Sequence, residues 1–267
     1  MPIEMESRGI PVLVSANSCF SHKRRAFRQV SPTLMDLDVA LDSAGFVAMR
    51  HYGRYPWSIA QYVEFALMNG FTWWSQMDCC VEPEVAGDRD TVIARIHATS
   101  QMLHLCREEA AAWLALCPEF EPFSSAPMPI LQGWQPDDYR LSAELSNEVL
   151  GGVWPDMVGV GSVCRRHLKG QHGLWRVLHE IDLVLPAHVK LHLFGVKGPA
   201  LKELADHPRV VSTDSMAFEL HARIEANKTK VSKTVAYRMA ALERWIAAQA
   251  PVPTPVGAEQ NLELAFV

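Results

Sequence analysis

Short apolar runs that alternate with helical patterns constrain the fold of this chain more than any other feature. Seven such runs occupy residues 10–16, 37–42, 72–78, 127–133, 156–162, 189–195 and 209–214. Each run is almost continuously apolar, which is typical of strands buried on both faces of a parallel sheet. Amphipathic helical patterns lie between them, over 58–70, 88–116 and 137–152. With one strand still to be placed, this alternation predicts a (β/α)8 TIM-type barrel rather than an open doubly wound sheet.

The length of the chain favours a single domain. Its 267 residues, 49% of them hydrophobic, are enough for one large domain with a full core and few for two. We expect the barrel domain to span 1–250 and a Pro-rich tail to follow over 251–267. The tail combines an extended spacer with a short apolar end, which could dock on the domain or on a partner.

Several functional classes lack support in the sequence. No window reaches the roughly 18 apolar residues of a membrane helix, and no leader pattern opens the chain, so we expect a cytoplasmic protein without a membrane partner. The six cysteines form no CxxC pair, and no HExxH motif accompanies them, so no metal site is predicted. Neither GxGxxG nor a P-loop motif is present, so we expect no nucleotide cofactor.

Polar residues follow nearly every predicted strand. Three of them are Asp42, Asp78 and Asp214. Each could serve only as the N-cap of the following helix. In a barrel, however, the carboxyl ends of the strands meet at one mouth, where active residues gather, so three carboxylates there favour a chemical role. A metal-dependent barrel hydrolase would be expected to carry His-x-His on its first strand, where this chain reads SANS. We therefore interpret His192 as a barrel-lining residue.

Two of the carboxylates suit glycosyl chemistry. An ionised aspartate can attack a sugar carbon while a second carboxyl of raised pKa moves a proton to or from the leaving group. Asp42 and Asp214 lie on the second and seventh predicted strands, three strands apart around an eight-stranded ring, so both can face one substrate. Asp78 would accept hydrogen bonds from a bound base or sugar.

Six segments resemble, in order, the motifs of the tRNA-guanine transglycosylases. They read LDSAGFVAM (41–49), MDCCVEPEV (77–85), PILQGW (129–134), MVGVGSVCR (157–165), LHLFGVKGP (191–199) and VVSTDSMAF (210–218). The fourth and sixth look more like the DpdA-type members of that superfamily, which place 7-deazaguanine bases in DNA. The chain also lacks any cysteine after Cys164, so the zinc-binding lobe of the tRNA enzymes has no counterpart. Ala44 and Val47 depart from the first motif of the family.

The resemblance implies specific roles. Asp214 would be the nucleophile at C1′ of the target nucleotide, and Asp42 the general acid and base. The base pocket would be formed by Ser43, Asp78, Cys80, Gln132, Gly133, Gly159, Val160, Gly161, Ser162, Phe194 and Gly195. Phosphates would be bound by Lys23, Arg24, Arg25, Arg165, Arg166 and Lys169, although such basic runs are also common on solvated surfaces. Because the target base must leave the duplex, we expect Trp134 or Tyr52 to support the flipped nucleotide unless they are core residues.

The implied function is replacement of guanine in DNA by a 7-deazaguanine such as 7-cyano-7-deazaguanine, without a cofactor. Its partners would be DNA and the free base; helper proteins that open the duplex and a homodimer stay open. Three alternatives remain at this stage. They are action on tRNA, hydrolysis of a nucleoside or glycoside by the same aspartate pair, and a nucleic-acid-binding barrel without catalysis.

Overall fold

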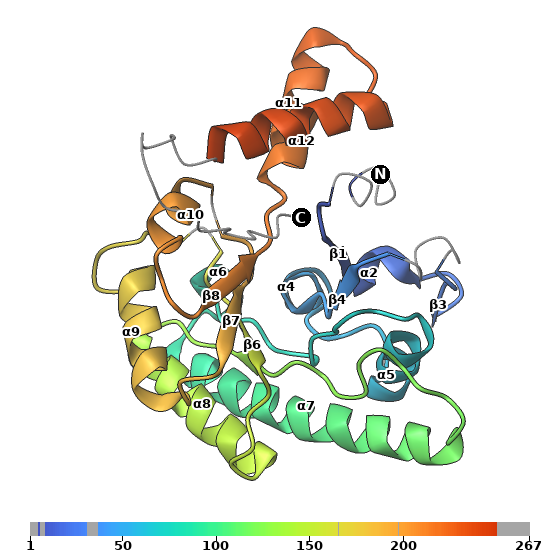
Figure 1. Ribbon diagram of the computed structural model, residues 1–267, viewed down its shortest axis with the longest axis vertical. Coiled ribbons are helices and arrows are strands. Elements are labelled where there is room, and N and C mark those ends of the chain that lie inside the picture. Colours follow the sequence, from blue (N-terminus) through green and yellow to red (C-terminus); the bar gives the residue numbers. More distant parts are fainter. Residues whose placement is uncertain (1–4, 6–8, 31–36, 165, 197, 250–267) are drawn as a thin grey trace.

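Parallel strand pairs form the frame of the protein (Figure 1). The computed structural model describes Met5 and residues 9–30, 37–164, 166–196 and 198–249. One parallel pair joins β1 (Val12–Ser15) to β4 (Val39–Asp42), with Ser15 opposite Asp42. A second sheet has the order β5, β6, β7, β8, all parallel, formed by Ile130–Leu131, Met157–Val160, Lys190–Leu193 and Val210–Thr213. Between β1 and β4, a short antiparallel hairpin of β2 (Phe20–Ser21) and β3 (Ala26–Phe27) interrupts the pattern, and the sequence did not predict it.

Two isolated parallel bridges connect the sheets. Leu41 pairs with Trp74, and Ser75 pairs with Met128 just before β5. The backbone N–H of Ser75 donates to the carbonyl of Leu41 at 2.9 Å, and that of Met128 donates to Trp74 at 2.8 Å. All seven predicted strand segments are therefore found, in order and parallel. No pairing between β8 and β1 occurs among the described residues, so the structure shows a single mixed α/β domain with parallel sheets and does not show a closed eight-stranded barrel.

Helices follow most of the strands. They are α2 (Ala16–Cys19), α4 (Gly45–Val47), the π-helix η1 (Ala48–Tyr52), α5 (Ile59–Met68), α6 (Pro83–Ala86), α7 (Arg89–Leu116), α8 (Pro136–Leu150), α9 (Leu174–Val184), α10 (Gly198–Leu204), α11 (Ala217–Thr229) and α12 (Val235–Gln249). The three predicted helices correspond to α5, α7 and α8. A capping box formed by Ser58 and Gln61 begins α5, and Gly151 in the left-handed conformation ends α8. Within the described residues, no helix is long and apolar enough to cross a membrane.

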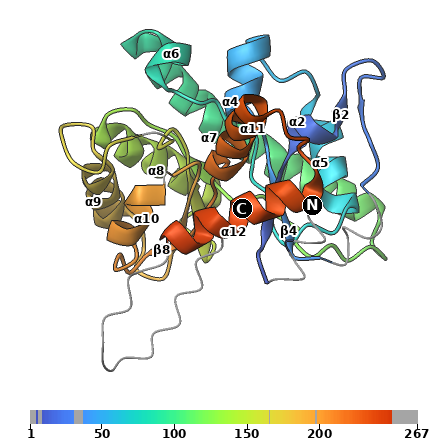
Figure 2. The same cartoon turned by 90° about the horizontal axis from the view of Figure 1, so that it is seen from above.

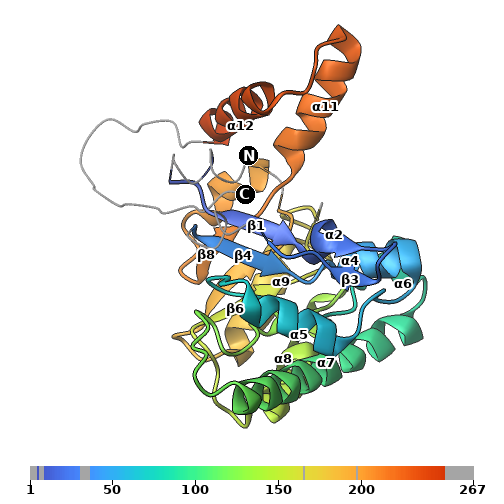
Figure 3. The ribbon, with the colours of Figure 1, turned by 90° about the vertical axis from the view of Figure 1, so that its right-hand side faces the viewer.

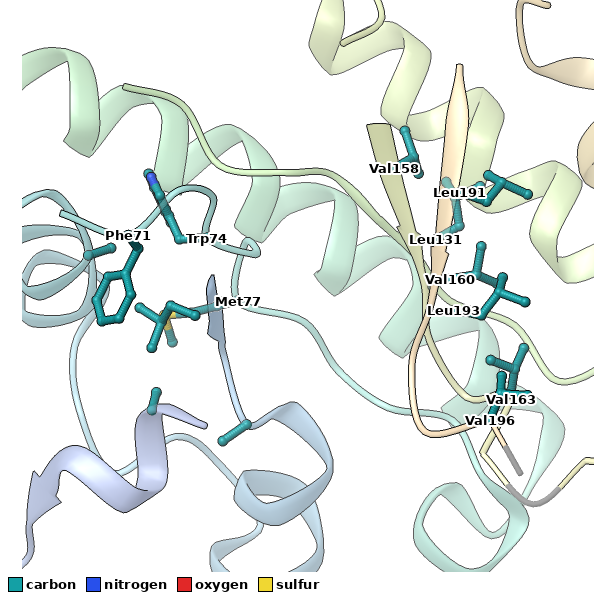
Figure 4. Close-up of a cluster of buried hydrophobic side chains, with 14 of the residues drawn as sticks. Phe71, Trp74, Met77, Leu131, Val158, Val160, Val163, Leu191, Leu193 and Val196 are labelled. Carbon is teal, nitrogen blue, oxygen red and sulfur yellow. The ribbon is translucent and has the colours of Figure 1, made fainter. Parts of the chain in front are cut away.

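The core is apolar on both sides of the central strands. Val158, Val160, Leu191 and Leu193 of β6 and β7 are fully buried. Figure 4 shows these side chains gathered along the strands, with a second group, which includes Trp74, on the β4 side. Because β6 and β7 are covered on both faces, the residues that follow their carboxyl ends are held rigidly.

The two last helices form a hairpin that also contacts α10. Helix α11 begins directly after the carboxyl end of β8, and α12 packs back on it. Figures 1 and 3 show this hairpin at the opposite end of the molecule from α7 and α8, and Figure 2 views it from that end. A salt bridge of 2.7 Å between Arg238 and Glu219 joins the two helices. The predicted tail, 251–267, lies outside the described residues, as does Arg165.

Candidate functional site

A cavity of about 360 Å³ lies at the carboxyl ends of the strands. The cavity is lined by all three predicted aspartates. Asp42 ends β4, Asp214 follows β8, and Asp78 lies three residues after Ser75, in the segment that forms the two isolated bridges. The rest of the lining is Ala44, Gly45, Phe46, Val47, Cys80, Glu82, Gln132, Gly161, Ser162, Cys164, Phe194 and Gly195. The volume falls in the range of small-molecule sites, roughly 300–1,000 Å³. The three aspartates, distant in sequence, therefore share one base-sized space.

Asp42 is the carboxyl group most altered by this environment. Burial is the main cause that raises its pKa to about 7, and the neighbouring carboxylates of Asp78 and Asp214 act in the same direction. Hydrogen bonds from the backbone of Ala44 and the side chain of Ser15 oppose the shift only in part. Asp42 consequently holds a proton up to neutral pH, as a general acid requires.

Asp78 is held by hydrogen-bond donors from three directions. Ser43 Oγ donates to its Oδ1 at 2.6 Å, Tyr55 Oη lies 3.3 Å from the same oxygen, and Gln132 Nε2 donates to its Oδ2. Burial raises the pKa of Asp78, and these three donors favour its ionised form. A Cβ at Gly45 would lie 2.5 Å from Oδ1 of Asp78, so only glycine leaves room for the carboxylate there.

Asp214 has two polar neighbours at one oxygen, of which the first makes a hydrogen bond. The backbone N–H of Gly195 donates to its Oδ1 at 2.8 Å, and His192 Nε2 lies 3.5 Å from the same oxygen. The other ring nitrogen of His192 is 2.8 Å from Ser212 Oγ, and the ring packs against Phe194. His192 is thus buried in the sheet, as a barrel-lining residue would be, but its contact with Asp214 was not apparent from the sequence.

Ser162 connects three groups at another part of the cavity wall. Its hydroxyl accepts a hydrogen bond from the backbone N–H of Val81 at 2.9 Å, and it lies 2.7 Å from Gln132 Oε1 and 3.0 Å from Glu82 Oε2. Its φ of +52° is in the left-handed region. Glu82, only 4% exposed, was missed by the sequence analysis. The signal was available, because it is a carboxyl group directly after the apolar Cys79, Cys80 and Val81.

The remaining predicted pocket residues fall into two groups, according to whether they line the cavity. Cys80, Gly161, Phe194 and Gly195 line the cavity directly. The others, Ser43, Gly133, Gly159 and Val160, are buried behind that lining. Gly159 still shapes the wall, because a Cβ there would lie 2.6 Å from the Phe194 ring.

The predicted phosphate-binding residues differ in their surroundings. Lys23, Arg24 and Arg25 are exposed in the turn between β2 and β3, and Lys169 is exposed as well. Arg166 differs from the expectation, because it is only 9% exposed. Its guanidinium donates to the carbonyls of Gly133, Trp134, Ser162 and His172. These bonds occupy the N–H donors of Arg166, so its side chain links the loops around the cavity instead of facing solvent.

The two aromatic residues predicted to support the flipped nucleotide, Trp134 and Tyr52, lie in different surroundings. The ring of Trp134 lies under the Arg166 guanidinium, 4.4 Å from its carbon, and it does not line the cavity. Tyr52 is 43% exposed and hydrogen-bonds His22 at 3.1 Å, next to the basic turn.

A larger groove, of about 1,030 Å³, adjoins the cavity and is lined mainly by α11 and α12. Cys164, Gly195 and Asp214 line both spaces. Asp214 therefore lies where the small cavity meets the larger groove.

No group of three or more His, Cys, Asp and Glu side chains in the described part of the chain is arranged to hold a metal ion. The fold and site together define an α/β protein whose carboxylate-lined cavity opens at the carboxyl edge of parallel strands. The family model of DpdA, DeoxyPurine in DNA protein A, matches residues 2–250, so the chain belongs to this family. Membership implies a transglycosylase that inserts a deazapurine into DNA. A comparison with curated proteins gives no match.

Proposed function

We propose that this protein exchanges guanine in DNA for a 7-deazaguanine through a covalent intermediate on Asp214. The observation that supports this most directly is the meeting of Asp42, Asp78 and Asp214 in one cavity, with Asp214 at its opening into the groove. The cavity has the size for a base, and the groove has room for the strand that carries it. Family membership supports DNA as the polymer.

In the first step, Asp214 attacks C1′ of the target nucleotide. Both of its described contacts are made by Oδ1, so Oδ2 is the oxygen that we expect to form the new bond. The bond between C1′ and the base nitrogen breaks, and Asp42 gives its proton to the departing guanine. The pKa of about 7 makes that proton available near neutral pH.

In the second step, Asp42 acts as the base. Its carboxylate takes the proton from N9 of the incoming 7-deazaguanine, and N9 attacks C1′. The bond to Asp214 breaks, which restores both aspartates to their starting states. One N-glycosidic bond is broken and a similar one is made, so the exchange requires no redox cofactor and no energy source.

Recognition of the base and of the strand uses different surfaces. Asp78 would accept hydrogen bonds from the N–H groups of a guanine-type edge, and Gln132 lies beside it. The flipped nucleotide would enter the cavity from the groove, and the exposed Lys23, Arg24 and Arg25 would contact phosphates.

A base-exchange assay tests this proposal. Purified protein is incubated with radiolabelled guanine and either duplex DNA or tRNA, with Asp214→Ala as the inactive variant and Asp206→Ala, at an exposed carboxylate nearby in the sequence, as the matched control. We expect label in DNA only, a fall in incorporation of on the order of 10³-fold or more in Asp214→Ala, and no effect of Asp206→Ala.

Other outcomes of the base-exchange assay would change the proposed function. Label in tRNA alone would identify a tRNA enzyme, and release of free guanine without incorporation would identify a hydrolase. If Asp214→Ala exchanged base as well as the native protein, the nucleophile would be assigned wrongly.

A further inference from the structure

The hydrogen bonds around Ser162 require a proton on a neighbouring group. A hydroxyl carries one proton and accepts up to two hydrogen bonds. The hydroxyl of Ser162 already accepts from the backbone N–H of Val81 at 2.9 Å. It also lies within hydrogen-bond distance of two acceptor oxygens, Gln132 Oε1 at 2.7 Å and Glu82 Oε2 at 3.0 Å. Its single proton cannot serve both.

The orientation of Gln132 decides where the Ser162 proton goes. The Nε2 group of Gln132 donates to Oδ2 of Asp78, which fixes Oε1 toward Ser162. Among the described residues, Ser162 is the donor that reaches Oε1. The shorter of the two contacts is also the one to Gln132. The proton of Ser162 therefore belongs to the bond with Gln132.

The contact between Glu82 and Ser162 is then satisfied only if Glu82 donates. A protonated Glu82 carboxyl can supply the second hydrogen bond that Ser162 Oγ is able to accept. Burial supports this form, because it is the largest influence on the pKa of Glu82 and raises it, and the negative charge of Asp78 adds to the rise. Hydrogen bonds from the Glu82 backbone, Ser162 and Cys80 oppose the rise only in part.

Within the part of the chain that the structure describes, no other titratable or charged group forms an ion pair with Glu82. Cys80 contributes a hydrogen bond, and Tyr139 of α8 faces it as a neutral phenol whose pKa is raised. Of the neighbouring cations, Arg95 of α7 donates to the carbonyl of Cys80, and Arg166 donates to that of Ser162.

We propose that Glu82 is a positioning residue of the base pocket, whose protonated carboxyl orients Gln132 through Ser162. The proposal rests on the function proposed above, since it assumes that Gln132 and Asp78 contact the base. When Glu82 loses its proton, the Ser162 hydroxyl turns toward the new carboxylate, and Gln132 Oε1 loses its donor. The amide is then free to rotate away from Asp78, so binding of the base weakens at alkaline pH.

Two variants separate this role from simple packing. In Glu82→Gln, the amide N–H₂ can donate to Ser162 at any pH, whereas Glu82→Ala removes the donor. The probe is free 7-cyano-7-deazaguanine, and its Kd is measured by calorimetry across the neutral and alkaline range. All proteins in this comparison carry Asp42→Asn, because Asp42 lines the same cavity and its pKa is about 7. In this background we expect the protein with Glu82 to lose affinity as the pH rises and Glu82→Gln to keep the neutral-pH affinity throughout. Glu82→Ala should bind about tenfold more weakly at neutral pH, the loss of one buried hydrogen bond. If Glu82→Gln bound as weakly as Glu82→Ala, or kept the alkaline loss, the proposal would be overturned.

A second measurement does not depend on the proposed function. The infrared spectrum of the ligand-free protein at neutral pH should contain a protonated carboxyl band that Glu82→Gln lacks, in addition to the band removed by Asp42→Asn. Identical spectra for the native protein and Glu82→Gln would overturn the proton assignment. If the native protein bound no base while this band was present, the proposed function would fail and the assignment of the proton would stand.

Discussion

His192 and Asp214 lie close together at the carboxyl ends of β7 and β8, with Nε2 of the histidine 3.5 Å from Oδ1 of the aspartate. Ser212 Oγ holds Nδ1 of the same ring at 2.8 Å, and Trp73 packs on the ring with 5.0 Å between centroids. The histidine is thus fixed by Ser212 and Trp73, whereas its Nε2 lies beside Asp214 without a hydrogen bond. The backbone N–H of Gly195 donates to the same oxygen of Asp214 at 2.8 Å.

Replacing His192 by phenylalanine should impair the chemistry and leave base binding intact. The new ring keeps the packing against Trp73 but loses the polar contacts to Asp214 and Ser212. Because a misplaced reacting group typically costs about 10²-fold in rate, we expect kcat for base exchange to fall by that order while the Kd for free base is unchanged. Ser212→Ala should cause a smaller loss. An unchanged kcat in His192→Phe would show that Gly195 alone orients Asp214.

Replacing Asp42 by asparagine should stabilise the protein at alkaline pH while removing its activity. The pKa of Asp42 is raised from 3.8 to about 7 in the folded state, so its contribution to stability is present below pH 3.8 and is lost as the pH rises to about 7. Above that pH, Asp42→Asn should exceed the native protein in free energy of unfolding by ~4 kcal/mol, and in acid the difference should disappear. Urea unfolding of both proteins, in acid and above pH 7, measures this difference in free energy. A difference independent of pH would mean that Asp42 does not titrate abnormally.

The exposed basic turn should govern the salt dependence of DNA binding. Replacing Lys23, Arg24 and Arg25 by alanine should weaken binding and reduce the slope of log K against log salt by roughly 0.9 for each phosphate that the turn neutralises in the native complex. Arg107→Ala, at an exposed position of α7, provides the control. If the slope of the triple variant matches that of the native protein, the turn does not bind DNA.

Replacing Arg166 should change the stability of the protein and not the salt dependence of DNA binding. Its donors bind buried carbonyls, so Arg166→Ala should lower the free energy of unfolding by about 3 kcal/mol, whereas Lys169→Ala, at an exposed position nearby, should leave it unchanged. Chemical unfolding of both variants makes the comparison. Equal stability of Arg166→Ala and the native protein would leave Arg166 available for a phosphate.

The strands could be predicted because their pattern is local. Runs such as 156–162 and 189–195 are apolar over most of their length, and the structure places β6 and β7 inside them. The carboxyl ends of parallel strands meet at one edge, which is why Asp42, Asp78 and Asp214 could be expected together. Closure of a barrel depends on strand tilt and stagger, which no single run encodes, and the two-residue strands β2 and β3 are too short to show a period.

The direction of individual side chains could not be predicted. In the run that contains Arg166 and Lys169, nothing in the spacing shows that the first turns inward to bind carbonyls while the second remains in solvent. Glu82 and the contact of His192 with Asp214 were missed for the same reason, because both depend on which segments the fold brings within a few ångströms.

The left-handed backbone of Ser162 has an evolutionary consequence. A serine with φ of +52° costs about 1 kcal/mol that glycine would avoid, yet glycine has no hydroxyl to offer Val81, Glu82 and Gln132. Loss of that hydroxyl would leave the buried N–H of Val81 and Oε1 of Gln132 without their partners, at about 1–3 kcal/mol each, which exceeds the backbone cost. Selection for stability therefore acts in the same direction as selection for the site. We expect descendants of this chain to keep serine at position 162 despite its left-handed backbone.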